Sequence, residues 1–261
     1  MKHLSKIFLL LTFISCQGQD KNTTTINEKP TLETTTELSK VEQYYNDNQG
    51  DDQLSKSTGT VSTGSLENGK LIPFKGESFQ YFDTLSYLSG RAFTNDKLKK
   101  TILDTYQELS TQLPGRQFFI MECSNQHGGK IFPHRTHQNG LSIDFMMPLT
   151  KDNKDYYELD TIGKDHYWLN FDDDGKFTKD KSISIEFDLV ARHILLLDEK
   201  ARNNGLKITK VIIKTELKDE LFATTYGQKL QASGIYIVKS LIPLINSLHD
   251  DHYHIDFEII K

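Results

Sequence analysis

Two stretches of the chain alternate apolar and polar residues with the two-residue period of a β-strand. Residues 141–146 place Leu, Ile and Phe on one face and Ser, Asp and Met on the other. Residues 252–259 alternate in the same way, so both histidines of this stretch project from one side of a strand. If the two strands are neighbours, Asp144 and His254 lie close together, and His137 reaches them from the loop before the first strand.

Helical periodicity is found in three further stretches. It covers residues 95–112 and 187–203, the latter followed by Gly205 as a C-terminal cap, and it favours a helix over 226–248 with a bend near Pro243. The pattern as a whole predicts an α+β fold, a single domain with a mainly antiparallel central sheet flanked by helices. The predicted strands cover residues 117–123, 141–147, 167–171, 208–214 and 254–260.

The N-terminus has the pattern of a secretory signal. Basic residues precede an apolar run over residues 7–14, which is too short to span a membrane, and Cys16 follows directly after Ser15. We interpret residues 1–15 as a lipoprotein-type signal peptide and expect a lipidated Cys16 to attach the protein to a membrane. The alternative is an ordinary cleaved signal in which Cys16 has no role.

Composition divides the remainder into a tether and a domain. Residues 16–40 are polar and poor in apolar anchors, which predicts a flexible tether, and residues 41–261 form the predicted folded domain. After lipidation Cys123 would be the only thiol, so no intramolecular disulfide is expected. The formal net charge of −5 gives no indication of a nucleic-acid-binding surface.

The candidate chemistry is that of a metal site on the sheet. His137, Asp144 and His254 offer imidazole and carboxylate ligands of the kind that zinc prefers. Three protein ligands leave a fourth position for water, as in hydrolytic zinc sites. An isolated His-x-His pair on a strand is more often a surface feature, but here the histidines cluster in two windows, residues 127–137 and 249–254.

Two motifs in and beside these windows resemble those of the penicillin-insensitive murein endopeptidases, zinc metallopeptidases related to the D-alanyl-D-alanine carboxypeptidases and the hedgehog domain. The first motif reads His-x-x-His-Gln-x-Gly-x-x-x-Asp over residues 134–144, and the second reads His-Asp-x-His-x-His over residues 249–254. The resemblance covers roughly residues 55–261. It implies the zinc ligands His137, Asp144 and His254, and it places His134, His249 and His252 around the metal.

The chain departs from the family pattern at two positions near the motifs. Ser142 stands where the family often has an acidic residue, and Asp256 stands where it often has an arginine. The better-known members also hold disulfides that this chain cannot form. These departures concern substrate detail and leave the expected metal ligands intact.

The general base is expected among the remaining histidines. Carboxypeptidase relatives place a glutamate just ahead of the closing metal histidine, whereas residues 251–254 contain none. His252 is therefore the candidate for the base or for stabilising the transition state, the alternative being a histidine that only orients a ligand. His249 is a further catalytic candidate, and His134 either contacts substrate or water or is structural.

The resemblance implies a zinc-dependent murein endopeptidase that hydrolyses peptide cross-links of peptidoglycan, between D-alanine and a diamino acid, through a zinc-activated water. Peptidoglycan peptide stems are then its partners, and an outer-membrane lipoprotein facing the periplasm is expected. The alternatives are a D,D- or L,D-carboxypeptidase of the same stems, a non-catalytic zinc-dependent cell-wall binding domain, and a peptidase acting on secreted proteins.

Overall fold

The computed structural model describes residues 39–261. The predicted signal peptide, residues 1–15, and all but the last two residues of the predicted tether, residues 16–40, lie outside this part. Helix α1 (Lys40–Asn48) begins at once, with Ser39 as its N-cap. Within the described residues, no helix is long and apolar enough to cross a membrane.

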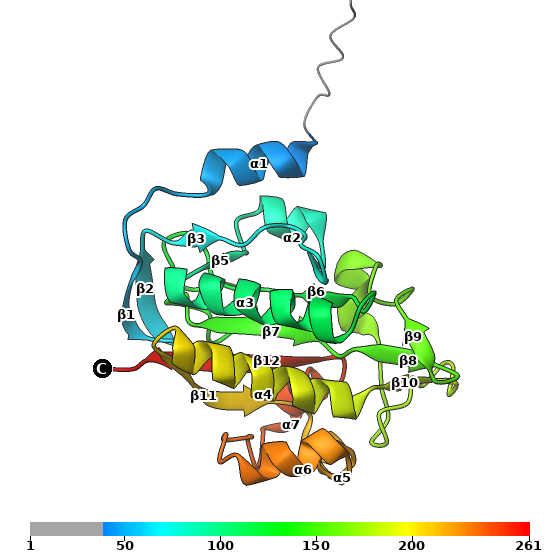
Figure 1. Ribbon diagram of the computed structural model, residues 1–261. Helices are drawn as coiled ribbons and strands as arrows, with labels where there is room; N and C mark the ends of the chain where they lie inside the picture. Colours follow the sequence, from blue (N-terminus) through cyan, green and yellow to red (C-terminus); the bar gives the residue numbers. More distant parts are fainter. Residues whose placement is uncertain (1–38) are drawn as a thin grey trace, which may run out of the picture. The chain divides into compact units, whose positions relative to one another are not determined.

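The centre of the domain is a five-stranded sheet with the strand order β11-β12-β7-β6-β4 (Figure 1). All neighbours are antiparallel except β4 and β6, which are parallel. The α+β prediction with a mainly antiparallel sheet is therefore confirmed. The strands are β4 (Phe79–Tyr81), β6 (Phe118–Ile120), β7 (Ser142–Met146), β11 (Leu206–Ile212) and β12 (His252–Ile259).

Two long helices lie side by side across one face of this sheet, α3 (Asp96–Gln112) and α4 (Phe187–Asn203) (Figure 1). Both were predicted from their periodicity. His193 of α4 contacts the rings of Phe145 and Tyr253, which point from β7 and β12 toward the helices. Because side chains alternate along a strand, the residues next to these aromatics, Asp144 on β7 and His254 on β12, point to the opposite face of the sheet.

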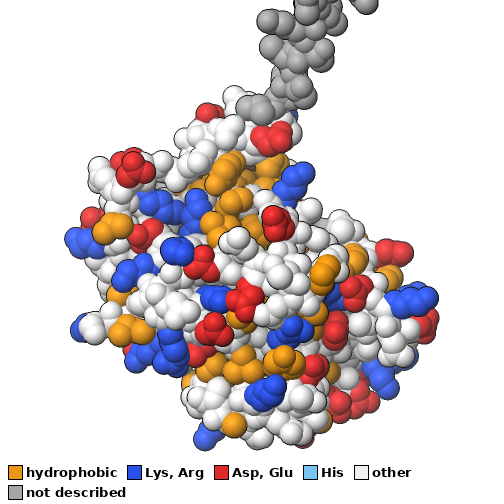
Figure 2. All heavy atoms as spheres, viewed as in Figure 1, with side chains coloured by type: hydrophobic (Ala, Val, Ile, Leu, Met, Phe, Trp, Pro, Cys, Tyr) orange, Lys and Arg blue, Asp and Glu red, His pale blue; other side chains and the backbone are white. Residues whose placement is uncertain are grey.

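Smaller elements surround the sheet. Two-stranded sheets pair β1 with β2 and β3 with β5, and a three-stranded sheet has the order β10-β8-β9. On the face that carries α3 and α4, acidic and basic side chains are interspersed (Figure 2). The bounds are β1 (Lys56–Thr60), β2 (Thr63–Glu67), β3 (Lys70–Leu71), α2 (Thr84–Leu88), β5 (Phe93–Thr94), β8 (Leu149–Lys151), β9 (Lys154–Tyr156), η1 (Gly163–Trp168), β10 (Ile183–Ile185), η2 (Thr215–Leu217), α5 (Lys218–Ala223), α6 (Thr225–Ala232) and α7 (Pro243–Ser247).

The helix expected over residues 226–248 is wrong. Helix α6 ends at Ala232, and Gly234 follows with a φ of +81°, a left-handed conformation that interrupts the helix. Beyond it, the backbone at Val211 of β11 forms hydrogen bonds with Tyr236 and Val238. Pairing with the sheet edge thus competes successfully with local helix propensity.

The strand expected over residues 167–171 is also wrong. Its first residues belong to the 3-10 helix η1, and Phe171 forms only an isolated bridge with Phe177. His166 on η1 is fully buried, with Nδ1 2.9 Å from the carbonyl oxygen of Leu159. The buried ring of His166 thus holds η1 in its helical conformation.

Candidate metal centre

The candidate ligands on the sheet are brought together by strand register. On β12 and β7, His254 is the direct cross-strand partner of Asp144. Directly opposed residues in an antiparallel pair have neighbouring side chains on the same face. The predicted neighbourhood of Asp144 and His254 is therefore confirmed.

The third candidate, His137, reaches the sheet from the loop that precedes β7. Its φ is +66°, an uncommon left-handed conformation for a residue other than glycine. The loop then turns at Gly140, with a φ of +76°, where a Cβ atom would lie 2.8 Å from the backbone nitrogen of Asn95. Glycine is therefore required there for the chain to enter β7 next to the histidine.

His137, Asp144 and His254 form a compact buried group. Asp144 Oδ1 lies 3.3 Å from His137 Nε2 and 2.7 Å from His254 Nδ1, and the two nitrogens are 3.1 Å apart. Each of the three residues is at most 3% exposed. The three predicted ligands are thus adjacent, with one atom of each within 3.3 Å of the other two.

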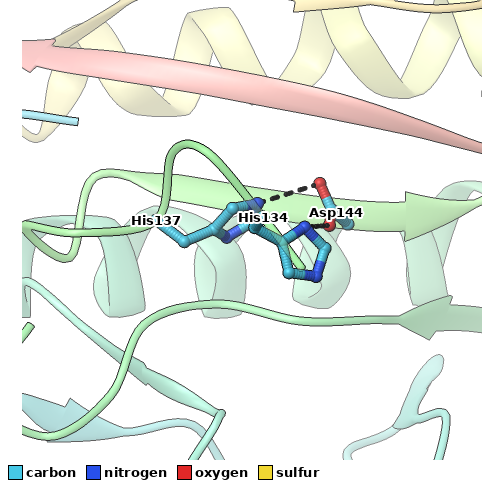
Figure 3. Close-up of side chains that lie close together, drawn as sticks. All are labelled: His134, His137 and Asp144. Atoms are coloured by element: carbon cyan, nitrogen blue, oxygen red, sulfur yellow. Dashed lines mark ion pairs between the residues drawn. The ribbon is translucent and has the colours of Figure 1, made fainter. Parts of the chain in front are cut away.

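His134 joins this group from the same loop. Its Nδ1 lies 3.6 Å from Asp144 Oδ2, and the ligand atoms of His134, His137 and Asp144 all lie within 4.8 Å of one another. Figure 3 shows both histidines turned toward the carboxylate. Asp144 Oδ2 is buried and has no hydrogen-bond partner among the described residues. An ionised carboxylate with a free buried oxygen, next to imidazole nitrogens, fits a divalent cation.

The electrostatics of Asp144 and His137 suit a metal. Burial alone would raise the pKa of Asp144, but the charges and hydrogen bonds of His137 and His254 hold it well below its usual range. Burial lowers the pKa of His137, although Asp144 partly opposes this effect. A charged carboxylate and a neutral imidazole are the protonation states in which these side chains bind metals. Burial opposes a charge on His254, but the carboxylates of Asp256 and Asp144 outweigh it and raise the pKa of His254 to about 10, so a metal ion would have to displace a proton from this ring.

Two further histidines, His252 and His249, stand beside the group with their ring centroids 4.9 Å apart. His252 Nδ1 donates to Asp251 Oδ1 at 2.5 Å, and His249 Nδ1 donates to the carbonyl of Ile245 at 2.6 Å. Burial would lower the pKa of His252, but the carboxylate of Asp251 outweighs this and raises it. Burial and the neighbouring His252 lower the pKa of His249 to about 3.

All six predicted site residues except His137 line one open cleft of about 730 Å³. Its mouth carries large exposed apolar side chains, among them Phe132 and Trp168, which are 89% and 76% exposed. Its lining also includes Arg135 and Lys164, neither of which forms an ion pair within residues 39–261. The cluster is therefore accessible to a ligand of substantial size.

Sequence reasoning missed Glu122. This residue is 3% exposed, and its Oε2 lies 2.6 Å from His134 Nε2 and is ion-paired with Arg91. Burial would raise the pKa of Glu122, but His134 and Arg91 lower it. No motif in the sequence near Glu122 marked it.

The match to known families decides the class of protein. Over residues 57–259, the chain matches the family described as penicillin-insensitive murein endopeptidase. The chain belongs to this family. It is therefore a metallopeptidase acting on murein, and the family implies a peptidoglycan substrate and a location in the cell envelope. No curated protein matches the chain. The matched segment includes both histidine windows, so the family resemblance seen in the motifs is confirmed.

Proposed function

We propose that this endopeptidase-family protein is a zinc enzyme that hydrolyses the peptide cross-links of peptidoglycan between D-alanine and a diamino acid. The observation that carries the proposal is the buried group of His137, Asp144 and His254 next to an open cleft. A carboxylate and two imidazoles are a ligand set that zinc accepts in hydrolytic sites.

His137, Asp144 and His254 are the proposed ligands, and His134 is not. His254 Nδ1 is within 3.1 Å of both other ligand atoms, whereas His134 comes no closer than 3.6 Å to Asp144. Three ligands leave a position for water, which a fourth histidine ligand would fill.

His252 is the proposed general base. When bound, zinc would polarise the scissile carbonyl and make water more acidic. With its Nδ1 held by Asp251, His252 has Nε2 free to accept a proton from the attacking water and return it to the leaving amine. His249 and His134 also line the cleft, and we assign them to contacts with the substrate around the scissile bond.

A carboxypeptidase acting on the same stems is the second candidate. Arg135 and Lys164 line the cleft without partners in the described part of the chain, and either cation could receive a terminal carboxylate. An endopeptidase would instead accommodate chain on both sides of the bond, which the open cleft permits.

The deciding experiment incubates zinc-loaded protein with purified cross-linked muropeptide dimers and identifies the products by mass spectrometry, with a chelated sample as control. Conversion of dimers to monomers only with zinc supports the endopeptidase. Loss of single terminal residues from intact dimers supports the carboxypeptidase. Zinc binding without cleavage would leave a binding domain, and cleavage by zinc-free His254→Ala protein would contradict the metal assignment.

We also propose that a lipid on Cys16 anchors the protein and that residues 16–40 act as its tether within the envelope. The support is the basic and apolar order of residues 1–15 directly before this cysteine. Mass spectrometry of the N-terminal peptide should show a diacylglyceryl group, which Cys16→Ser should remove. An unmodified cysteine in membrane-free protein would contradict the anchor.

A further inference from the structure

A second row of polar residues lies directly beside the proposed ligands on the sheet, the group of His137, Asp144 and His254 that we call the metal group. Lys210 of β11 is the cross-strand partner of Asp256 on β12, and Asp256 is the partner of Ser142 on β7. This row is displaced by two residues from the row that pairs His254 with Asp144, so both rows lie on the same face. Asp256 and Ser142 are 2% and 0% exposed.

The carboxylate of Asp256 has a partner on each side. Its Oδ1 accepts hydrogen bonds from His254 Nε2 at 2.7 Å and from Ser142 Oγ at 2.6 Å. Its Oδ2 lies 2.7 Å from Lys210 Nζ. The other ring nitrogen of the histidine, Nδ1, is the atom that faces Asp144 and His137.

We propose that Asp256, fixed by Ser142 and Lys210, is a positioning residue that keeps the proton of His254 on Nε2 and so presents Nδ1 to the metal. We call these three residues the His254 clamp. The inference rests on the proposed function in one respect, namely that His254 is a metal ligand. No protonation change in the clamp is required.

Each member of the clamp has a distinct physical task. The carboxylate accepts from Nε2–H, which fixes both the tautomer and the ring orientation of a metal-binding histidine. The Ser142 hydroxyl holds Oδ1 in place. Lys210 balances the negative charge of Asp256, which is a second buried carboxylate close to Asp144.

The same pair of strands supplies a matched control. Lys207 and Glu258 are also direct cross-strand partners on β11 and β12 and form an ion pair, with Nζ 2.5 Å from Oε1. Their side chains are 46% and 52% exposed and contact no site histidine. Lys207→Met and Glu258→Gln therefore remove a cross-strand ion pair without touching the metal group.

The test measures the zinc dissociation constant of the full-length chain by competition with a chelator of known affinity. Asp256→Asn should weaken zinc binding by about 10- to 100-fold, as expected when a partner of a ligating histidine is lost. An amide can donate to His254 Nε2 and so favour the wrong tautomer, as a similar replacement does in a catalytic triad. Lys210→Met and Ser142→Ala should weaken zinc binding less than Asp256→Asn does. Lys210→Arg, which keeps the positive charge, should bind zinc as tightly as the wild type.

A second readout is the tautomer itself. In the zinc-loaded protein, the ¹⁵N NMR signals of His254 should show a protonated Nε2 in the wild type and an altered pattern in Asp256→Asn. The control variants should keep both the wild-type tautomer and the wild-type zinc affinity. A role confined to sheet stability would lower the melting temperature without changing either readout.

Several outcomes would overturn the inference. One is that Asp256→Asn binds zinc with wild-type affinity. Another is that Glu258→Gln loses as much zinc affinity as Asp256→Asn does. An effect of Lys210→Met on KM alone would assign Lys210 to substrate binding and remove it from the clamp. If Asp256→Asn fails to fold, the zinc affinities of Lys210→Met and Lys207→Met are compared instead. Equal affinities in these two variants would overturn the inference.

The two proposals fail separately. If zinc affinity follows the clamp but no muropeptide is cut, the clamp stands and the endopeptidase is wrong. If muropeptides are cut in a zinc-dependent way while Asp256→Asn binds zinc normally, the endopeptidase stands and the clamp is wrong.

Discussion

At the scale of single residues, the five histidines in and beside the proposed ligand group differ in what holds them. His137 and His254 contact Asp144, His134 contacts Glu122, and His252 contacts Asp251. His249 instead contacts the backbone carbonyl of Ile245. A carboxylate partner on the ring determines which nitrogen is free for chemistry. Residues of one type thereby acquire different tasks.

The first prediction concerns His252. His252→Ala should lower kcat by about 10²- to 10⁴-fold, because a positioned general base is lost, while zinc affinity stays close to that of the wild type. Turnover of muropeptide dimers and chelator competition measure the two quantities. The control His127→Ala changes an exposed loop histidine outside the cleft and should change neither. A large loss of zinc from His252→Ala would make this residue a ligand instead.

The ligand candidates could be predicted from the sequence because their spacing forms motifs and their strands alternate clearly. Glu122 and Lys210 could not, since each reaches the site only through strand order and register across the sheet. Their nearest neighbours along the chain give no indication of the contact. The assignment of roles among the histidines likewise needs their hydrogen-bond partners.

At the scale of elements, the sheet separates two environments. The face under α3 and α4 is apolar and buried, and the other face holds the charged group. Periodicity predicted α3, α4, β7 and β12 well because each has one clearly apolar side. It failed for residues 167–171 and 226–248, where a buried histidine and an edge pairing with β11 determine the local structure.

The second prediction uses His193, which α4 buries against β12 with Nδ1 2.6 Å from the hydroxyl of Tyr253. Burial lowers its pKa from 6.5 to about 3. Its neutral form stabilises the fold fully above pH 6.5, and this stability is lost as the pH falls toward 3, because only the unfolded chain then binds the proton. The free energy of unfolding should fall by up to about 1.4 kcal/mol per pH unit in this window.

His193→Gln removes the titration and should make this slope shallower, as measured by denaturant unfolding between pH 4 and 7 at intervals of about one unit. His127→Gln, on an exposed loop, serves as the matched control and should retain the wild-type slope. An unchanged slope in His193→Gln would show that other groups cause the acid sensitivity.

At the scale of the whole molecule, the cleft joins the metal group to an apolar mouth. Phe132 and Trp168 remain exposed at its rim although large aromatic side chains usually find cover. Exposed apolar groups around a cleft are typical of ligand-binding surfaces. The family substrate, peptidoglycan, is large enough to contact this rim.

The third prediction tests the rim. Trp168→Ala should raise KM for muropeptide dimers by about tenfold, equivalent to ~1.4 kcal/mol of binding free energy, with little change in melting temperature. The matched control is Leu54→Ala, since Leu54 is 79% exposed and lies outside the cleft. A KM equal to that of the wild type would exclude Trp168 from substrate binding.

The fourth prediction concerns metal removal. Zinc at 100 times its dissociation constant should stabilise the folded chain by about 2.7 kcal/mol, because the ligands are assembled only after folding. A chelator should therefore lower the melting temperature in differential scanning calorimetry. Asp144→Ala protein should show no response to zinc, and a full response in this variant would place the metal elsewhere.

The burial of the proposed ligand group should also limit which proteins of the envelope can be cut. The proposed ligands His137, Asp144 and His254 are at most 3% exposed, so in the proposed enzyme a scissile bond would have to reach them through the cleft as an extended strand. Cross-linking peptides have this freedom, whereas the backbone of a folded neighbour is held in its own hydrogen bonds. Steric exclusion would therefore spare bystander proteins, even without recognition of their sequences.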